Sequence, residues 1–106
     1  MTRKTLPDRR PSCTRMVQWA GQTFPVTLGI DPMTGDVREV FADVARGGDL
    51  QWVVSDSCVI VSLALQHGIA PADLAKSLGR VPSWQGEVPA SPLGAVVEAI
   101  LREVKG

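Results

Sequence analysis

The residues best suited to binding an anion stand at the start of a long apolar segment. Arg46, Gly47 and Gly48 come directly before Asp49 and the run 50–66. Small residues let a ligand approach the unpaired N–H groups of a first helical turn, where the helix dipole favours negative charge. A Gly-Gly pair before an aspartate cap is also an ordinary junction between a loop and a helix, and Asp49 would occupy those donors itself. An anion- or nucleotide-binding role for Arg46, Gly47 and Gly48 is therefore one of two open interpretations.

Asp56 is the one acidic residue inside that apolar run. At about 100° per residue it falls between Trp52 and Ile60, away from the polar side of the predicted helix. We therefore expect a buried carboxylate that needs an ion pair or hydrogen bond, with Arg38 as an available cation, because an unpaired buried carboxylate is costly. The functional alternative is an acid or base in a cleft, although no second catalytic group lies nearby in the sequence.

The remaining reactive side chains are few. Cys58 is expected to be a small core residue, and His67 to interact with free backbone carbonyls at the end of the long helix. Cys13 lies among basic residues that favour a thiolate, which makes it the more reactive cysteine. Two cysteines and one histidine cannot supply four zinc ligands, and the chain has no Walker loop, dinucleotide fingerprint or nucleophile elbow. The sequence predicts no catalytic residue, no metal site and no cofactor held by this chain.

The net charge is zero, but it is unevenly distributed. The first fifteen residues hold one acid, Asp8, against five bases: Arg3, Lys4, Arg9, Arg10 and Arg15. We expect residues 1–14 to form a basic flexible arm and residues 15–106 to form a single domain. The arm is either a solvated terminus or a docking segment for a polyanion such as phosphate, nucleic acid or an acidic protein surface, formed by Arg9, Arg10 and Arg15.

Three short segments in the first half have the composition of strands: 15–20, 23–30 and 37–42. A tight turn at Gly21-Gln22 separates the first two, and turn-forming residues fill 31–36. Apolar residues at spacing two place one set of side chains on a buried face: Phe24, Val26, Leu28 and Ile30. Pro25 cannot donate to a ladder, so its strand is expected at a sheet edge or with its nitrogen pointing outward. The segments predict a three-stranded antiparallel meander.

The second half predicts three helices that pack on one face of this sheet, which gives an α+β fold. The first, 50–66, has a narrow polar sector and is otherwise apolar, so we expect it to be central and nearly buried: Gln51, Ser55, Ser62 and Gln66 form the sector. A short helix follows over 71–79, then a loop over 80–90. Ser91 and Pro92 are typical of an N-cap and a first helical position, and they open a last amphipathic helix.

Composition places limits on where the chain resides. Hydrophobic residues make up 44% of the 106 residues, which excludes disorder of the whole chain. The longest apolar stretch, 58–65, is interrupted by Ser62 and is far shorter than the ~18–20 residues that cross a bilayer. No apolar signal-peptide region follows the first basic residues. We expect a cytoplasmic protein.

Several segments together resemble the TSCPD domain, over about residues 7 to 104. They are FPVTLGID at 24–31, Gly35, REVF at 38–41, GGDL at 47–50, SLALQHG at 62–68 and LAKSLG at 74–79. That domain is found near the C-terminus of adenosylcobalamin-dependent (class II) ribonucleoside-diphosphate reductases and in small stand-alone proteins. The resemblance implies an α+β fold and a link to deoxyribonucleotide synthesis, with the cobalamin site in the large barrel of the reductase.

The chain departs from the family at the motif that names it. Where Thr-Ser-Cys-Pro-Asp would stand, this sequence has PASPL at 89–93. Ser91 replaces the cysteine and keeps the N-cap, and Pro92 keeps the first-turn proline, but the thiol and the carboxylate are missing. No catalytic residue of the family can therefore be placed on this sequence.

Three functional hypotheses follow. The first is a non-catalytic accessory or regulatory module that binds a reductase large chain or its own copy, with Trp84 and Trp52 as interface anchors; Trp84 could equally pack under its own loop. The second is a small nucleic-acid or nucleotide-binding protein that uses the basic arm and Arg46. The third is an enzyme in its own right that uses Asp56 and His67.

Overall fold

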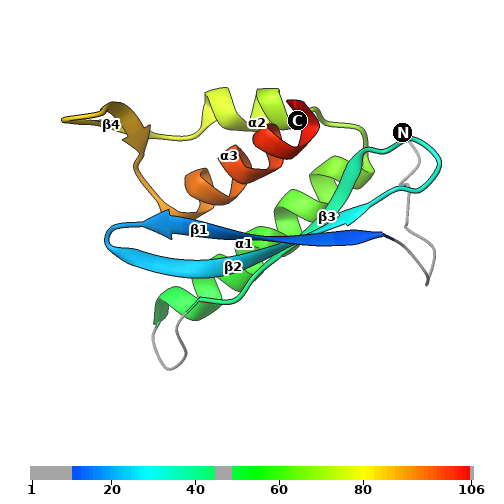
Figure 1. Ribbon diagram of the computed structural model, residues 1–106, viewed down its shortest axis with the longest axis horizontal. Coiled ribbons are helices and arrows are strands. Elements are labelled where there is room, and N and C mark those ends of the chain that lie inside the picture. Colours follow the sequence, from blue (N-terminus) through cyan, green and yellow to red (C-terminus); the bar gives the residue numbers. More distant parts are fainter. Residues whose placement is uncertain (1–10, 45–48, 106) are drawn as a thin grey trace.

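The computed structural model describes residues 11–44 and 49–105, and it confirms the α+β fold. A three-stranded antiparallel sheet contains β1 (Ser12–Trp19), β2 (Gln22–Ile30) and β3 (Val37–Ala42) in that order. The helices follow, as Figure 1 shows: α1 (Asp49–Gln66), α2 (Pro71–Ser77) and α3 (Pro92–Lys105). Between α2 and α3 the chain forms a small hairpin of β4 (Arg80–Ser83) and β5 (Gly86–Pro89).

One apolar core lies between the sheet and two helices. α1 packs mainly on β3, α3 packs on α2 and on β1, and both α1 and α3 contribute to the same cluster of buried residues. The predicted inner face of β2 is confirmed, since Phe24, Val26 and Leu28 are buried and Ile30 is half-buried. The largest fully buried side chains come from β2, β3, α1 and α3: Val26, Leu28, Val40, Val54, Leu65, Val96, Val97 and Ile100.

The first strand begins earlier than the sequence indicates. β1 starts at Ser12 and not at Arg15, so residues 12–14 of the predicted arm belong to the sheet. Arg9 and Arg10 lie outside the described residues. The strand extends because each of these residues has a partner on β2, with Ser12 opposite Gly29 and Cys13 opposite Leu28.

The position of β2 corrects one expectation. β2 is the central strand, so the first of the two alternatives for Pro25, an edge strand, is wrong. Pro25 is accommodated because the pairing of β2 with β3 begins one residue later, at Val26. The Pro25 carbonyl still accepts from the Asp43 N–H (3.1 Å), so the missing N–H falls at the end of the ladder with β3.

The turn between β1 and β2 is one residue earlier than predicted and is strained. It consists of Ala20 and Gly21, which both have positive φ, 51° and 78°, as a type I′ turn requires. This region favours glycine and asparagine over alanine.

Replacing Ala20 with asparagine should relieve this strain. We expect Ala20→Asn to raise the free energy of unfolding by about 0.5–1 kcal/mol, because asparagine adopts the left-handed conformation at lower cost. Thermal unfolding followed by circular dichroism measures the change. Gly21→Ala is the opposite control and should lower the melting temperature, and equal effects of the two substitutions would contradict the assignment of strain to this turn.

The burial of α1 differs from the prediction. The expectation of a nearly buried helix is wrong: Val54, Cys58, Val61 and Leu65 face the core, while a second apolar side of the helix is exposed. The reason is that the fold has two layers. The sheet covers one side of α1 and α3 contacts another. Among the described residues, no element covers the remaining side.

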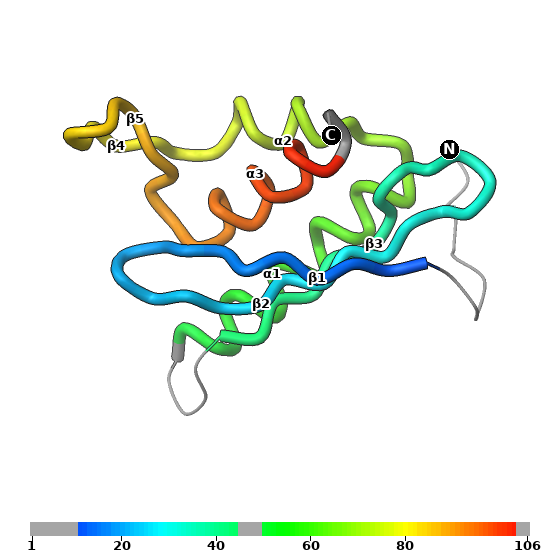
Figure 2. Tube along the Cα trace, in the orientation of Figure 1, coloured from blue at the N-terminus to red at the C-terminus, as the bar shows by residue number. Residues whose placement is uncertain are grey.

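The segment expected as a loop, 80–90, holds the β4–β5 hairpin. Val81 pairs with Val88 across its two strands, and Gly86 has a φ of 99° at the turn. The Ser83 hydroxyl donates to the Gly86 carbonyl (2.8 Å) and accepts from the Gln85 N–H (3.1 Å). A cross-strand valine pair and a turn glycine are enough to form a short hairpin. Figure 2 shows it at the same end of the molecule as the turn between β1 and β2.

Candidate functional site

The outward face of α1 carries a group of large exposed apolar side chains. Four large side chains lie on it: Trp52 is 67% exposed, Val53 61%, Val59 55% and Ile60 67%. Their spacing places them on the side of the helix opposite the core, where half-buried Leu63 also lies. A contiguous group of exposed apolar side chains on a folded domain typically marks an interaction surface.

Asp56 lies in the middle of this face, and the expectation that it is buried is wrong. Its side chain is exposed, and the sequence places Trp52, Val59 and Ile60 one helical turn away on either side. Hydration stabilises the carboxylate, so it needs no buried cation. The expected partner, Arg38, binds elsewhere: its guanidinium donates to the Leu65 carbonyl (2.8 Å) and to the Asp36 carboxylate (3.1 Å).

A second surface is a groove of about 980 Å³ between the sheet and the β4–β5 hairpin, called here the hairpin groove. Its walls come from β1 and the turn that follows, from the hairpin, and from one side of α3 that includes Ala95, Glu98 and Arg102. Trp84 stands at its rim with 91% of its surface exposed, so the alternative that Trp84 packs under its own loop is wrong. Trp19 is half-buried on the opposite wall.

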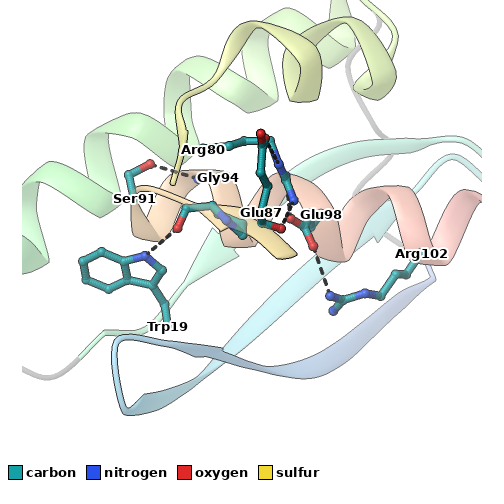
Figure 3. Close-up of polar contacts among 8 residues, drawn as sticks. Trp19, Arg80, Glu87, Ser91, Gly94, Glu98 and Arg102 are labelled. Carbon is teal, nitrogen blue, oxygen red and sulfur yellow. Dashed lines mark hydrogen bonds and ion pairs between the residues drawn. The ribbon is translucent and has the colours of Figure 1, made fainter. Parts of the chain in front are cut away.

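Polar contacts fix the walls of the hairpin groove, as Figure 3 shows. The Trp19 indole N–H donates to the Pro89 carbonyl (3.3 Å) and ties β1 to β5. The Glu98 carboxylate accepts from Arg80 (2.9 Å) and from Arg102 (3.2 Å), which ties the hairpin to α3. Gly94 allows this close packing, because a Cβ there would stand 2.9 Å from the Pro89 Cβ.

The residues at the position of the family motif have a structural role. The Ser91 hydroxyl accepts a hydrogen bond from the Gly94 N–H (3.2 Å), and α3 begins at Pro92, so the predicted N-cap and first-turn proline are confirmed. Pro89 and Ala90, directly before this cap, line the hairpin groove. The motif position therefore borders the groove.

The two cysteines are both free thiols in the described chain, and only one matches its prediction. Cys58 is a core residue as expected, and burial raises the pKa of its thiol to about 11. Cys13 is not activated: burial and the Glu103 carboxylate raise its pKa, against the lowering effect of Arg15. The prediction of a thiolate favoured by basic neighbours is wrong, because burial of the thiol has the largest effect on its pKa and Glu103, which forms an ion pair with Arg15 (2.8 Å), adds to it.

The remaining predicted residues are only partly placed. Arg46, Gly47 and Gly48 lie outside the described residues, as do Arg9 and Arg10. The His67 ring Nδ1 lies 2.8 Å from the Leu63 carbonyl, as expected for a histidine at a helix end. Within residues 11–44 and 49–105, no cluster of three metal-ligating side chains is present, and no helix is both long and apolar enough to span a membrane.

Sequence reasoning missed most residues of both surfaces. The expectation of a nearly buried helix over 50–66 does not reveal that Val53, Val59 and Ile60 are exposed, and the expectation of a loop over 80–90 does not reveal the wall residues Val81 and Val88. One signal could have revealed the hairpin, namely two valines that flank a turn with Gly86. No equivalent signal exists for the outward face of α1, because apolar residues look alike whether a neighbour covers them or not.

Of three comparisons with known proteins, one gave a match. The searches of curated proteins and of solved structures returned no match. The model of the TSCPD domain family matches residues 1–104, which is nearly the whole chain. On this match, and on the α+β fold that carries the quoted segments, the chain belongs to the TSCPD domain family.

Proposed function

We propose that this chain is a non-catalytic accessory module of deoxyribonucleotide synthesis that binds the large chain of a class II ribonucleoside-diphosphate reductase. Membership of the TSCPD family supports the link to these reductases. The observation that carries the binding role is the outward face of α1, where four large apolar side chains are more than half exposed. In this proposal adenosylcobalamin and the radical chemistry belong to the reductase chain.

The charge on this face favours a different protein over a second copy as the partner. Asp56 lies at the centre of the apolar group, with Trp52 and Ile60 one turn before and one turn after it. A two-fold contact centred on this face would bring two Asp56 carboxylates together, because both copies use the same patch. Like charges in a desolvated contact are destabilising. A partner that presents a lysine or arginine surrounded by apolar side chains is complementary to this face in both charge and apolar surface.

Binding to the reductase tests the proposal directly. The full chain is titrated with the purified class II reductase chain of the same organism by isothermal calorimetry. We expect a complex that Trp52→Ala weakens by about 30-fold or more, because a central tryptophan is a typical interface anchor worth at least about 2 kcal/mol. Asp56→Lys should weaken it by a similar amount through charge repulsion.

A matched control distinguishes a specific contribution of this face from a general effect of removing exposed apolar surface. Met33 is 90% exposed and lies in the turn between β2 and β3, so Met33→Ala should leave the affinity unchanged. The proposal fails if no complex forms at tens of micromolar, or if the Trp52 and Asp56 variants bind as tightly as the unmodified chain. Size-exclusion chromatography of the chain alone should show a monomer; a dimer disrupted by Trp52→Ala would indicate a second copy as the occupant.

A further inference from the structure

The two edge strands of the sheet differ in whether their outward backbone groups have hydrogen-bond partners. At the outer edge of β3, the Ser62 hydroxyl accepts from the Val40 N–H (3.0 Å) and lies 3.3 Å from the Val40 carbonyl, while the Gln66 amide donates to the Arg38 carbonyl (3.2 Å). The polar sector of α1 therefore satisfies backbone groups that have no partner strand. This is a common way to protect an edge that would otherwise pair with another chain.

The outward groups of β1 can be assigned from the register. The two-residue turn makes Trp19 and Gln22 a hydrogen-bonded pair, and such pairs alternate along an antiparallel ladder. Met16 and Gln18 then direct their N–H and C=O groups away from β2. Two observations agree with this assignment. Pro25, which has no N–H, stands opposite Met16, where no hydrogen bond between β1 and β2 is expected. The Ile30 N–H donates to the Pro11 carbonyl (2.9 Å), as expected if every second residue counted back from Trp19 is bonded to β2.

This edge lacks the protection that β3 has. Among residues 11–44 and 49–105, none forms a hydrogen bond with the outward backbone groups of Met16 or Gln18. β1 is eight residues long and carries one charge, Arg15, whose side chain is held by Glu103. Natural edges of this length are usually blocked by a charge, a proline or a covering element.

The hairpin groove runs along this open edge. Its lining includes consecutive residues of β1, from Met16 to Trp19, whose side chains point alternately to the two faces of the sheet. Val81, Trp84 and Val88 of the β4–β5 hairpin line it as well. Met16 is 63% exposed, Val81 44% and Trp84 91%, so these side chains offer apolar surface that an occupant could bury.

From these observations we infer that the edge of β1 binds an extended peptide segment of a partner protein, which lies in the hairpin groove and extends the sheet by one strand. Main-chain groups of the peptide pair with Met16 and Gln18, and its alternate side chains are apolar and contact Trp84 and the valines of the hairpin. This site is separate from the outward face of α1.

The charges of the groove add one feature to the peptide. Of the described residues that line it, Glu98 and Arg102 are charged, and Glu98 also binds Arg80. Arg80 also pairs with the Glu87 carboxylate (3.8 Å). Among the described residues, Glu98 is therefore the one carboxylate partner of Arg102 but not of Arg80. The Arg102 side chain is 72% exposed and that of Glu98 27%, so the positive partner is the accessible one. We expect an aspartate or glutamate in the peptide near Arg102.

Selection of peptides from a random library tests the inference without assuming a partner. The full chain is used as bait for a phage-displayed library of 12-residue peptides, and the enriched consensus peptide is synthesised and measured by fluorescence polarisation. We expect enriched sequences with apolar residues at alternate positions and one acidic residue. Hydrogen exchange of the complex should show slowed exchange at the amides of Met16 and Gln18, which face solvent in the chain alone.

Paired variants separate the backbone contact from side-chain effects. Met16→Pro removes the outward N–H and leaves the ladder with β2 intact, so the consensus peptide should bind at least about tenfold more weakly; Met16→Ala keeps the N–H and should stay within about threefold. Trp84→Ala should also weaken binding about tenfold, and its 91% exposure means that the fold does not depend on it, so it decides the test even if Met16→Pro does not fold.

Two results would overturn the inference. One is a library that yields no enriched alternating sequence. The other is a consensus peptide that binds the Trp84→Ala variant as tightly as the unmodified chain and leaves the Met16 and Gln18 amides unprotected. Either outcome leaves the binding of the reductase through α1 untouched, and Trp52→Ala, which should not change peptide affinity, shows which of the two surfaces is in use.

Discussion

Replacing Ser62 with alanine is expected to lower the free energy of unfolding by about 2 kcal/mol. Ser62 is 9% exposed, and its hydroxyl is the partner of the Val40 N–H at the outer edge of β3. Alanine leaves that N–H buried without an acceptor, and an unsatisfied buried donor costs about 1–3 kcal/mol. The same hydroxyl lies 2.8 Å from the Cys58 carbonyl within α1, a contact that is lost too.

A second serine on the same helix provides the control. The Ser57 hydroxyl donates to the Val53 carbonyl (2.6 Å), but that carbonyl is already part of the helix ladder and Ser57 is only half-buried. Ser57→Ala should change stability by no more than about 0.5 kcal/mol, because alanine also has the higher helix propensity. Urea unfolding of both variants gives the comparison. Equal effects would mean that the β3 edge does not depend on Ser62.

The second large effect is expected at Ile100. This side chain is fully buried in α3, so Ile100→Ala should lower the free energy of unfolding by about 3–4 kcal/mol through lost apolar burial and the cavity left behind. Ile60 is the same residue type in α1 but is 67% exposed, and Ile60→Ala should lie within about 0.5 kcal/mol of the unmodified chain.

The contrast between the two isoleucines also bears on function. If Ile60 contributes nothing to stability, its apolar surface is available for a partner, as the proposed docking of the reductase requires. If Ile60→Ala destabilised the chain as strongly as Ile100→Ala, the outward face of α1 would have to be covered within the fold, and its assignment as a binding surface would be wrong. Chemical unfolding with matched protein concentrations distinguishes these outcomes.

The elements that depend on local periodicity could be predicted from the sequence. Spacing-two apolar residues defined the inner face of β2, and the range 37–42 of the third strand matches β3. Ser91 and Pro92 marked the start of α3 correctly because a cap and its proline act within one helical turn. These features require no knowledge of distant neighbours.

The burial of α1 could not be predicted in the same way. Ser62 and Gln66 are polar and yet buried, since they serve the free edge of β3, whereas Trp52 and Ile60 are apolar and exposed. A strand edge that needs donors and acceptors is a property of the assembled sheet, and no local pattern in 50–66 records it. Asp56 is exposed for the same reason, because it lies on the outward face of α1 with Trp52 and Ile60.

The tie between Trp19 and the Pro89 carbonyl spans seventy residues of chain and has a consequence for biosynthesis. The inner side of β1 is covered by α3, whose residues Val96 and Ile100 are fully buried. Because α3 follows β1 to β3 and α1 in the chain, the inner side of β1 stays uncovered until residues 92–105 have been synthesised. A truncation before residue 96 would remove Val96 and Ile100 and leave apolar surface of the sheet exposed, which favours aggregation.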